Sequence, residues 1–221
     1  MRPVASLYRA KLYKSVQAWV LPATTFIVFV QLLVYCIQLW TNDDHIGTFW
    51  ASRKVIPQLW RLVTYAFVHG SLMHVISNVA MTLVLSPTLE FIHGPLVVCL
   101  VWGFGVIGGA VAHVSANETI AVVGSSAGVY AILVARIYDV FVNMQNMRTW
   151  PLQLLTLFCL GLPGLVDWIT TDELTTTSHS AHLGGAAFGF AAAIISVKKL
   201  KSATEYTWDV WASSDDDTDI I

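Results

Sequence analysis

Long apolar stretches alternate with short polar ones along most of the chain. Each stretch holds about twenty residues, the length that an α-helix needs to cross the hydrocarbon core of a bilayer. The pattern predicts six membrane-spanning helices, over residues 19–40, 62–86, 95–114, 120–142, 150–169 and 180–198. None of the loops between them is long enough for a globular domain. We therefore expect an all-α, polytopic membrane protein with its membrane domain over residues 19–198.

The two ends of the chain differ from this domain. Residues 1–18 are polar and carry four basic side chains: Arg2, Arg9, Lys11 and Lys14. A cleavable signal peptide would place a shorter apolar core nearer to the start, so we interpret residues 19–40 as a retained first helix. The tail over residues 199–221 ends in an acidic run and is predicted to be disordered in solvent.

Composition supports the membrane interpretation. Only 12% of the residues are charged, against about 25% in soluble proteins. The net charge is −2, whereas nucleic-acid-binding proteins are usually basic. We therefore expect the lipid bilayer, and not nucleic acid, as a partner. The odd number of cysteines excludes a simple disulfide framework, and we interpret all three as small buried hydrophobic residues: Cys36, Cys99 and Cys159.

Basic residues predict the orientation in the membrane. They follow the last span and lie in the 143–149 loop and the N-terminal segment, which places both termini in the cytosol. The 41–61 loop also carries basic residues, which weakens this bias without reversing it. The opposite, outer face then holds the glycosylation sequon at residues 117–119.

A serine and a histidine lie near the predicted outer ends of two different spans. Ser126 is about six residues into the fourth span, and His182 is about two residues into the sixth. At about 1.5 Å rise per residue, both lie within roughly 10 Å of the outer boundary. A hydroxyl and an imidazole at one depth are the minimum parts of a nucleophile–base pair.

Small residues predict where helices approach closely. Gly124 and Gly128 flank Ser126, and Gly185 and Gly189 follow His182, so these glycines are expected to let the two helices touch. The pair Gly105 and Gly109 in the third span is interpreted as generic bundle packing. The fifth span contains Gly161, Pro163 and Gly164, which indicate either a mobile gate or a tolerated kink.

The second predicted span carries a polar stripe. His74 and Asn78 are four residues apart and share a helix face, where they could donate hydrogen bonds to an oxyanion or tie helices together. His69, five residues before His74, is expected to point elsewhere. His74, His179 and His182 could hold a metal, but no carboxylate is expected at their depth, and we predict no metal site.

These motifs, in this order, resemble the rhomboid intramembrane serine proteases over roughly residues 60–195. The residues that carry the resemblance are Trp60-Arg61, His69, His74, Asn78, Gly124-Ser125-Ser126, Tyr130, Ala181-His182, Gly185 and Gly189. The resemblance implies a rhomboid-like bundle of six helices without a cofactor. Ser126 would be the nucleophile and His182 the base, with no acidic third member.

The resemblance also implies supporting roles and a substrate class. His74, Asn78 and the backbone N–H of Ser126 would stabilise the oxyanion, and Tyr130 would pack against the imidazole. The substrates would be single-span membrane proteins, cleaved near the outer end of their transmembrane segment. The Gly-Val-Tyr-Ala sequence looks most like the secretory-pathway rhomboids of animals.

One departure from the family motif leaves an alternative open. Ala127 replaces the second glycine of Gly-x-Ser-Gly, and its methyl could crowd the scissile carbonyl unless Gly128 relieves it. The alternative is a non-catalytic relative that binds client transmembrane helices. Ser125 is a rival nucleophile, but Ser126 has the family spacing to Tyr130. A small transporter would need inverted repeats, and none is seen.

Overall fold

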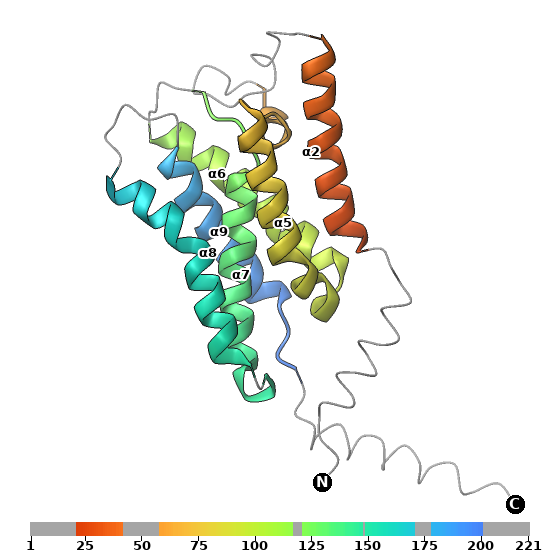
Figure 1. Ribbon diagram of the computed structural model, residues 1–221. Helices are drawn as coiled ribbons and strands as arrows, with labels where there is room; N and C mark the ends of the chain where they lie inside the picture. Colours follow the sequence, from red (N-terminus) through yellow and green to blue (C-terminus); the bar gives the residue numbers. More distant parts are fainter. Residues whose placement is uncertain (1–20, 42–57, 117–120, 148, 171–177, 201–221) are drawn as a thin grey trace, which may run out of the picture.

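The computed structural model describes residues 21–41, 58–116, 121–147, 149–170 and 178–200. Long helices make up most of these residues (Figure 1). In chain order the elements are α2 (Pro22–Thr41), α4 (Arg61–Thr64), the 3-10 turn η2 (Tyr65–Phe67), α5 (Leu72–His93), α6 (Pro95–Ser115), α7 (Ser126–Asn143), the 3-10 turn η3 (Met144–Asn146), α8 (Trp150–Thr170) and α9 (His179–Ser196).

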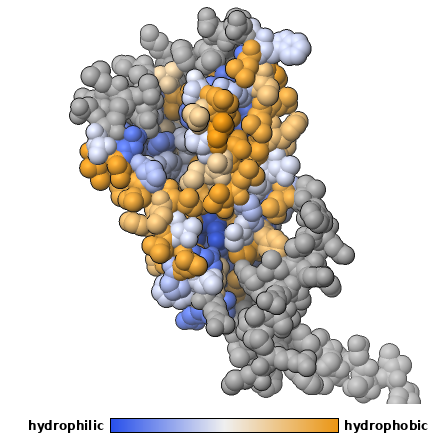
Figure 2. Space-filling model, viewed as in Figure 1, coloured by the Kyte–Doolittle hydropathy of each residue, from blue (hydrophilic) through white to orange (hydrophobic). Residues whose placement is uncertain are grey.

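The helices form a bundle with α9 at its centre. α9 packs along both α6 and α7, and α6 also packs against α7. α2 and α5 cover one side of this group, and α8 lies on the other, mainly against α7 (Figure 1). Hydrophobic side chains dominate the face shown in Figure 2, as expected for a surface that meets lipid.

Five of the described helices are long and apolar enough to cross a membrane: α2, α5, α6, α7 with its η3 extension, and α8. α9 has 18 residues and is rich in glycine and alanine, and its mean hydropathy is too low for it to be counted among these candidate spans. One face of α9 packs against α6 and α7 through small side chains, and the large apolar side chains of the helix, such as Leu183 and Ile195, are exposed. The predicted all-α membrane bundle is confirmed.

Two of the predicted spans had the wrong start. The stretch predicted as a helix over 62–86 is broken between Val68 and Ser71, and α5 begins only at Leu72 and continues to His93. Ser71 adopts an extended conformation and its side chain accepts a hydrogen bond from the His74 N–H at 3.2 Å, which caps the new helix. The apolar pattern runs through this break and therefore hid it.

The fourth predicted span, 120–142, also begins later than expected. Residues 121–125 are not helical, and α7 starts at Ser126. Gly124 has a φ of 101°, a conformation that favours glycine, and its N–H donates to the Tyr65 carbonyl at 3.0 Å. Ser126 is thus the first residue of its helix and not the sixth or seventh.

The cysteine interpretation is wrong. Cys36, Cys99 and Cys159 are all exposed on helix surfaces. The physical reason is that the lipid-facing side of a membrane helix is as apolar as its packed side, so an apolar context does not predict burial. The N-terminal segment 1–18, the sequon at 117–119 and residues 201–221 of the tail lie outside the described residues, and the orientation of the termini stays a prediction.

A buried polar cluster joins the ends of several helices. Asp139 on α7 pairs with His93 at 2.8 Å and with Arg136 at 2.5 Å, and it accepts a hydrogen bond from Asn143 at 2.8 Å. Arg136 also donates to Gln153 on α8, and Asn143 binds the backbone that follows α9. Each charge has partners, as burial in an apolar bundle demands. This cluster anchors α5, α7 and α8 to each other.

Candidate active site

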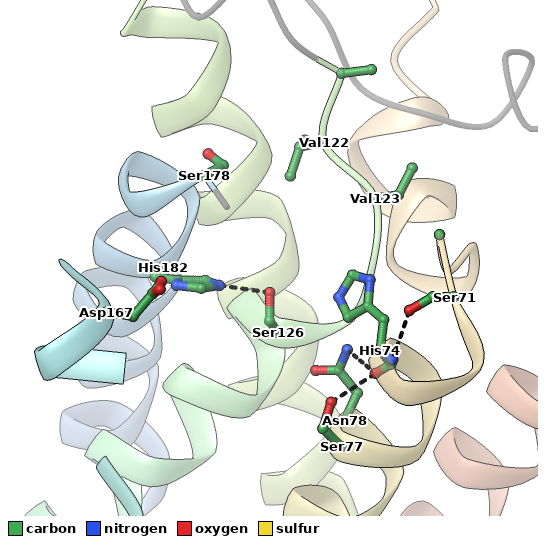
Figure 3. Close-up of a pocket in the computed structure, with 12 residues that line it drawn as sticks. Ser71, His74, Ser77, Asn78, Val122, Val123, Ser126, Asp167, Ser178 and His182 are labelled. Carbon is green, nitrogen blue, oxygen red and sulfur yellow. Dashed lines mark hydrogen bonds between the residues drawn. The ribbon is translucent and has the colours of Figure 1, made fainter. Parts of the chain in front are cut away.

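A polar pocket of about 640 Å³ lies where the first turns of α5, α7 and α9 meet the last turn of α8. Figure 3 shows side chains from all four helices directed into it. The polar residues of its lining are Ser71, His74, Ser77, Asn78, Ser126, Asp167, Ser178 and His182.

The structure brings Ser126 and His182 together in this pocket. The Oγ of Ser126 and the Nε2 of His182 lie 2.8 Å apart, within hydrogen-bond distance. The Tyr130 ring stacks on the imidazole, with ring centroids 4.4 Å apart and planes at 28°. This stack restrains the ring orientation, so the imidazole can present one nitrogen steadily to the hydroxyl.

Ser125, the rival serine, points elsewhere. It is completely buried, and its hydroxyl donates to the Gln31 side chain of α2 at 2.9 Å. The sequence analysis missed Gln31 and Gln38, which lie seven residues apart on the first helix. Two amides on one face of an otherwise apolar helix are the signal that could have found them, because such groups need polar partners inside the bundle.

The backbone before Ser126 is shaped by Gly124. A methyl group at Gly124 would lie 2.5 Å from the His74 ring, so glycine is required both for its φ and for this close approach. Because Ser126 opens α7, the first backbone N–H groups of the helix have no partner within it. They place a partial positive charge next to the hydroxyl of Ser126.

His74 and Asn78 line the pocket from α5. Figure 3 shows them on the side of Ser126 away from His182, so the hydroxyl lies between the imidazole and this polar stripe. The Asn78 amide donates one hydrogen bond to the His74 carbonyl at 3.0 Å, which holds the side chain in place.

The expectation that His69 points away from this stripe is wrong. Its ring lies edge-on against the His74 ring, with centroids 5.1 Å apart and planes at 77°. The reason is that the helix is interrupted before α5. His69 and His74 therefore do not share a helix, and helical spacing does not apply to them. Gln38 holds the His69 backbone through its N–H and its carbonyl, each at 3.3 Å.

His69 is also buried without hydrogen bonds from its ring. Only 1% of the residue is exposed, and neither ring nitrogen has a partner among the described residues. Burial, with a further effect from the neighbouring His74, lowers the pKa of His69 to about 4. The ring is therefore neutral at physiological pH and adds no charge beside His74.

The glycines of α9 allow the close approach of α7. A side chain at Gly185 would overlap the backbone of Ala127, and one at Gly189 would overlap Ala131. The glycines on either side of Ser126 face other neighbours, because Gly128 in α7 contacts the Trp102 indole on α6 and Gly124 before α7 contacts His74. The contact between α7 and α9 therefore joins glycines of one helix to alanines of the other.

Ala127 does not line the pocket. Its methyl is 1% exposed and lies against Gly109 on α6, where any added side chain would overlap it. The methyl is thus turned away from the pocket, and its effect on a scissile carbonyl stays a prediction. Gly105 and Gly109 serve helix packing, as expected, and the helix that they let approach is α7 near its start.

The pocket contains a carboxylate that the sequence analysis did not expect. Asp167 lies in the last turn of α8 and lines the pocket together with His182. The statement that no acidic residue lies at this depth is therefore wrong. Asp167 lies within the fifth predicted span, near its outer end, and was given no role there.

Comparison with known proteins agrees with this architecture. The family model described as the rhomboid domain matches residues 57–199, well over half of the chain. The human rhomboid-related protein 3 is 33% identical over 148 residues, which are 62% of this chain and 36% of that protein. The Caenorhabditis elegans rhomboid-related protein 1 is 28% identical over 160 residues, 70% of this chain and 45% of that protein.

A third relative has a name that bears on activity. The Caenorhabditis elegans inactive rhomboid-related protein 2 is 23% identical over 208 residues, 87% of this chain and 60% of that protein. The chain thus spans from about a third to three fifths of the length of these relatives. The family match, the helical membrane bundle and the order of the motifs together identify the chain as a multi-pass membrane protein that belongs to the rhomboid family.

Proposed function

We propose that this protein is an intramembrane serine endopeptidase, which cleaves transmembrane segments of single-span membrane proteins near their outer end. The observation that supports this most directly is the 2.8 Å distance between Ser126 Oγ and His182 Nε2 inside a polar pocket. A hydroxyl bonded to an imidazole is the arrangement that general-base activation of a serine requires.

The first step transfers a proton and forms a bond. His182 Nε2 accepts the proton of the Ser126 hydroxyl while the oxygen attacks the carbonyl carbon of the scissile peptide. The carbonyl oxygen becomes negatively charged in the tetrahedral intermediate. The stacked Tyr130 ring keeps the imidazole aligned, since a ring that rotates freely would spend little time in the reactive geometry.

The groups on the other side of Ser126 are suited to hold the oxyanion. The N-terminus of α7 directs backbone N–H groups, including that of Ser126, towards the site, and His74 and Asn78 line the pocket beside it. These donors exist before substrate binds, so little reorganisation is needed as the charge develops.

Collapse of the intermediate breaks the peptide bond and releases the amine, which takes the proton from His182. The acyl group stays on Ser126 until a water molecule, deprotonated by His182, attacks it and releases the carboxylic acid. Side chains and backbone N–H groups of the protein, with one water molecule, supply every group in this series of steps. The proposal therefore includes no cofactor. The polar pocket provides the path for water.

The substrate class and location follow from the same proposal. A stable helix hides its peptide bonds, so a segment with a weak helix near its outer end is the best substrate. We place the protein in the secretory pathway with both termini in the cytosol, on the basis of its resemblance to animal rhomboids and its basic residues. The competing function is the binding of client helices without cleavage. Because one relative is named as inactive, the experiment must distinguish binding from cleavage.

The test uses the purified chain in proteoliposomes with a tagged single-span substrate. We expect cleavage to fall about a thousandfold or more in Ser126→Ala and in His182→Ala. Ser125→Ala is the matched control, because it removes the neighbouring hydroxyl that binds Gln31 outside the pocket. A fluorophosphonate is expected to label the wild type at Ser126.

The two functions give different results in this test. Cleavage that survives in Ser126→Ala contradicts the nucleophile assignment. Binding of the substrate without cleavage, together with no fluorophosphonate labelling of the wild type, supports the non-catalytic function instead.

A further inference from the structure

One charged side chain interrupts the apolar sequence of α8. Asp167 is the only Asp, Glu, Lys or Arg residue in Trp150–Thr170. It lies in the last turn of the helix, where a negative charge meets the negative end of the helix dipole. The helix itself is therefore not stabilised by a carboxylate at this position. An ionisable residue in a membrane helix most often serves a site that faces the protein interior.

The face of α8 that carries Asp167 is turned towards the candidate dyad. Gly161, Gly164 and Asp167 follow each other at intervals of three residues and are half-buried, whereas the residues between Asp167 and Gly164 are exposed. A side chain at Gly164 would overlap the hydroxyl of Tyr130, so α8 lies directly against this phenol. The ring of Tyr130 in turn stacks on His182.

Asp167 approaches the imidazole from the side opposite to the serine. Both residues line the same pocket. Figure 3 shows the carboxylate and the His182 ring pointing towards one another, with Ser126 beyond the other edge of the ring. Because Nε2 faces Ser126, the nitrogen on the Asp167 side is Nδ1.

We propose that Asp167 is a positioning residue for His182, which converts the serine–histidine pair into a three-membered arrangement. This inference rests on the proposed protease function. The carboxylate accepts the Nδ1–H of His182, so that Nε2 keeps its lone pair directed at the Ser126 hydroxyl. When Nε2 takes the serine proton, the carboxylate stabilises the resulting imidazolium without taking a proton itself.

The pH dependence of the serine reactivity separates this role from a structural one. The titratable groups that line the pocket, or stack on a ring that lines it, are His69, His74, Tyr130, Asp167 and His182. Of these, Asp167 is the one carboxylate, and it faces the imidazole. Its removal makes protonation of His182 less favourable, which moves the acidic limb of the rate profile to lower pH.

The experiment measures the rate of fluorophosphonate labelling of Ser126 in the full chain in proteoliposomes, from about pH 5 to pH 9. We expect Asp167→Asn to label about 10- to 100-fold more slowly than wild type at neutral pH, with its acidic limb at lower pH. Asp167→Glu keeps the charge and is expected to recover part of the rate and the wild-type profile. Trp168→Phe, an exposed neighbour in the same turn, is the control and should match wild type.

The outcomes distinguish this role from the proposed function. A wild-type rate and profile in Asp167→Asn overturns the positioning role while the protease assignment stands. A slower rate with an unchanged profile in both Asp167 variants also overturns it, because it indicates only a structural effect. Failure of the wild type to label at Ser126 overturns the proposed function itself, and the role of Asp167 falls with it.

Discussion

α8 and α9 line the same pocket and are built in opposite ways. α8 is apolar enough to cross a membrane, yet only 6% of its most apolar segment is buried. α9 has a lower mean hydropathy and is not such a candidate, yet it packs along both α6 and α7 and buries all its glycines and the alanines Ala181, Ala192 and Ala193. In a membrane protein, hydropathy therefore reports contact with lipid more than it reports burial in the core.

This difference matters for the site because each helix contributes one group to it. α9 holds His182 against Ser126 through close contacts of its backbone with α7. α8 brings Asp167 on a helix that lies mostly outside the core, where Gly164 contacts the Tyr130 hydroxyl and Gln153 accepts from Arg136 at the other end. The dyad thus rests on two closely packed helices, whereas the carboxylate comes from a helix that packs against α7 over a smaller area.

The largest loss of activity is expected from a large side chain placed between α9 and α7. Gly185→Leu places a side chain where the Ala127 carbonyl lies, so the helices must separate and His182 must move away from Ser126. A displacement of about 1 Å costs roughly a hundredfold in rate, and we expect at least that loss of substrate cleavage. Gly161→Ala on α8 is the matched control, because its methyl meets only the end of the Leu133 side chain at 3.3 Å. Equal losses in both variants contradict the contrast between the helices.

The next effect concerns the turn that leads into α7. Gly124→Ala introduces a side chain at a φ of 101° and against the His74 ring, and we expect about a tenfold or greater loss of kcat. The thermal unfolding temperature should fall as well, because the strained conformation costs about 1–2 kcal/mol. Gly103→Ala in α6, which has no neighbour within 4 Å, serves as the control and should behave as wild type. A fully active Gly124→Ala variant would show that the position of His74 is unimportant.

His69 packs against the pocket-lining His74 and is buried, but its ring has no hydrogen-bond partner among the described residues. Its pKa of about 4 lies below the usual value of about 6.5, so the unfolded chain binds a proton that the folded chain does not. The stability that this neutral ring allows is present above pH 6.5 and is lost as the pH falls towards 4, by on the order of 3 kcal/mol. Unfolding temperatures measured over this range should fall less in His69→Gln than in wild type. An identical fall in both chains argues against a buried neutral ring.

The smallest effect is expected where α8 touches α7. Gly164→Ala places a methyl at the position of the Tyr130 hydroxyl, so the ring must shift and kcat should fall a few-fold. Tyr130→Phe alone keeps the stacked ring and should have a smaller effect. In the double variant the missing hydroxyl makes room for the methyl, and we expect recovery towards the Tyr130→Phe value. If the kcat losses of the two single variants simply add in the double variant, Gly164 and Tyr130 do not interact. α8 would then lie farther from the dyad than the structure shows.

Much of the helical framework could be predicted from the pattern alone. The third predicted span, 95–114, agrees closely with α6, because Gly94 and Pro95 mark a sharp helix start. The starts of α5 and α7 could not be predicted in this way. Apolar residues continue through both non-helical segments, and the features that end those segments are a side-chain cap at Ser71 and the unusual φ of Gly124.

The candidate site was predictable in its centre and not at its edges. Ser126 and His182 stand out because polar side chains are rare within apolar spans. The supporting contacts join residues that are distant in sequence, as Gly109 with Ala127 or Gln31 with Ser125. No pattern in a single chain reveals such pairs, since each depends on which helix faces which.

The amino-acid sequence alone specifies that this chain forms a helical membrane bundle, because only structures that satisfy their own backbone hydrogen bonds can cross lipid. It also marks the serine and the histidine that such a bundle must hide from lipid. Only the tertiary structure decides which face of each helix is packed, since both faces are apolar. That choice turns Ala127 towards Gly109 and away from the pocket, and it brings Asp167 to the imidazole.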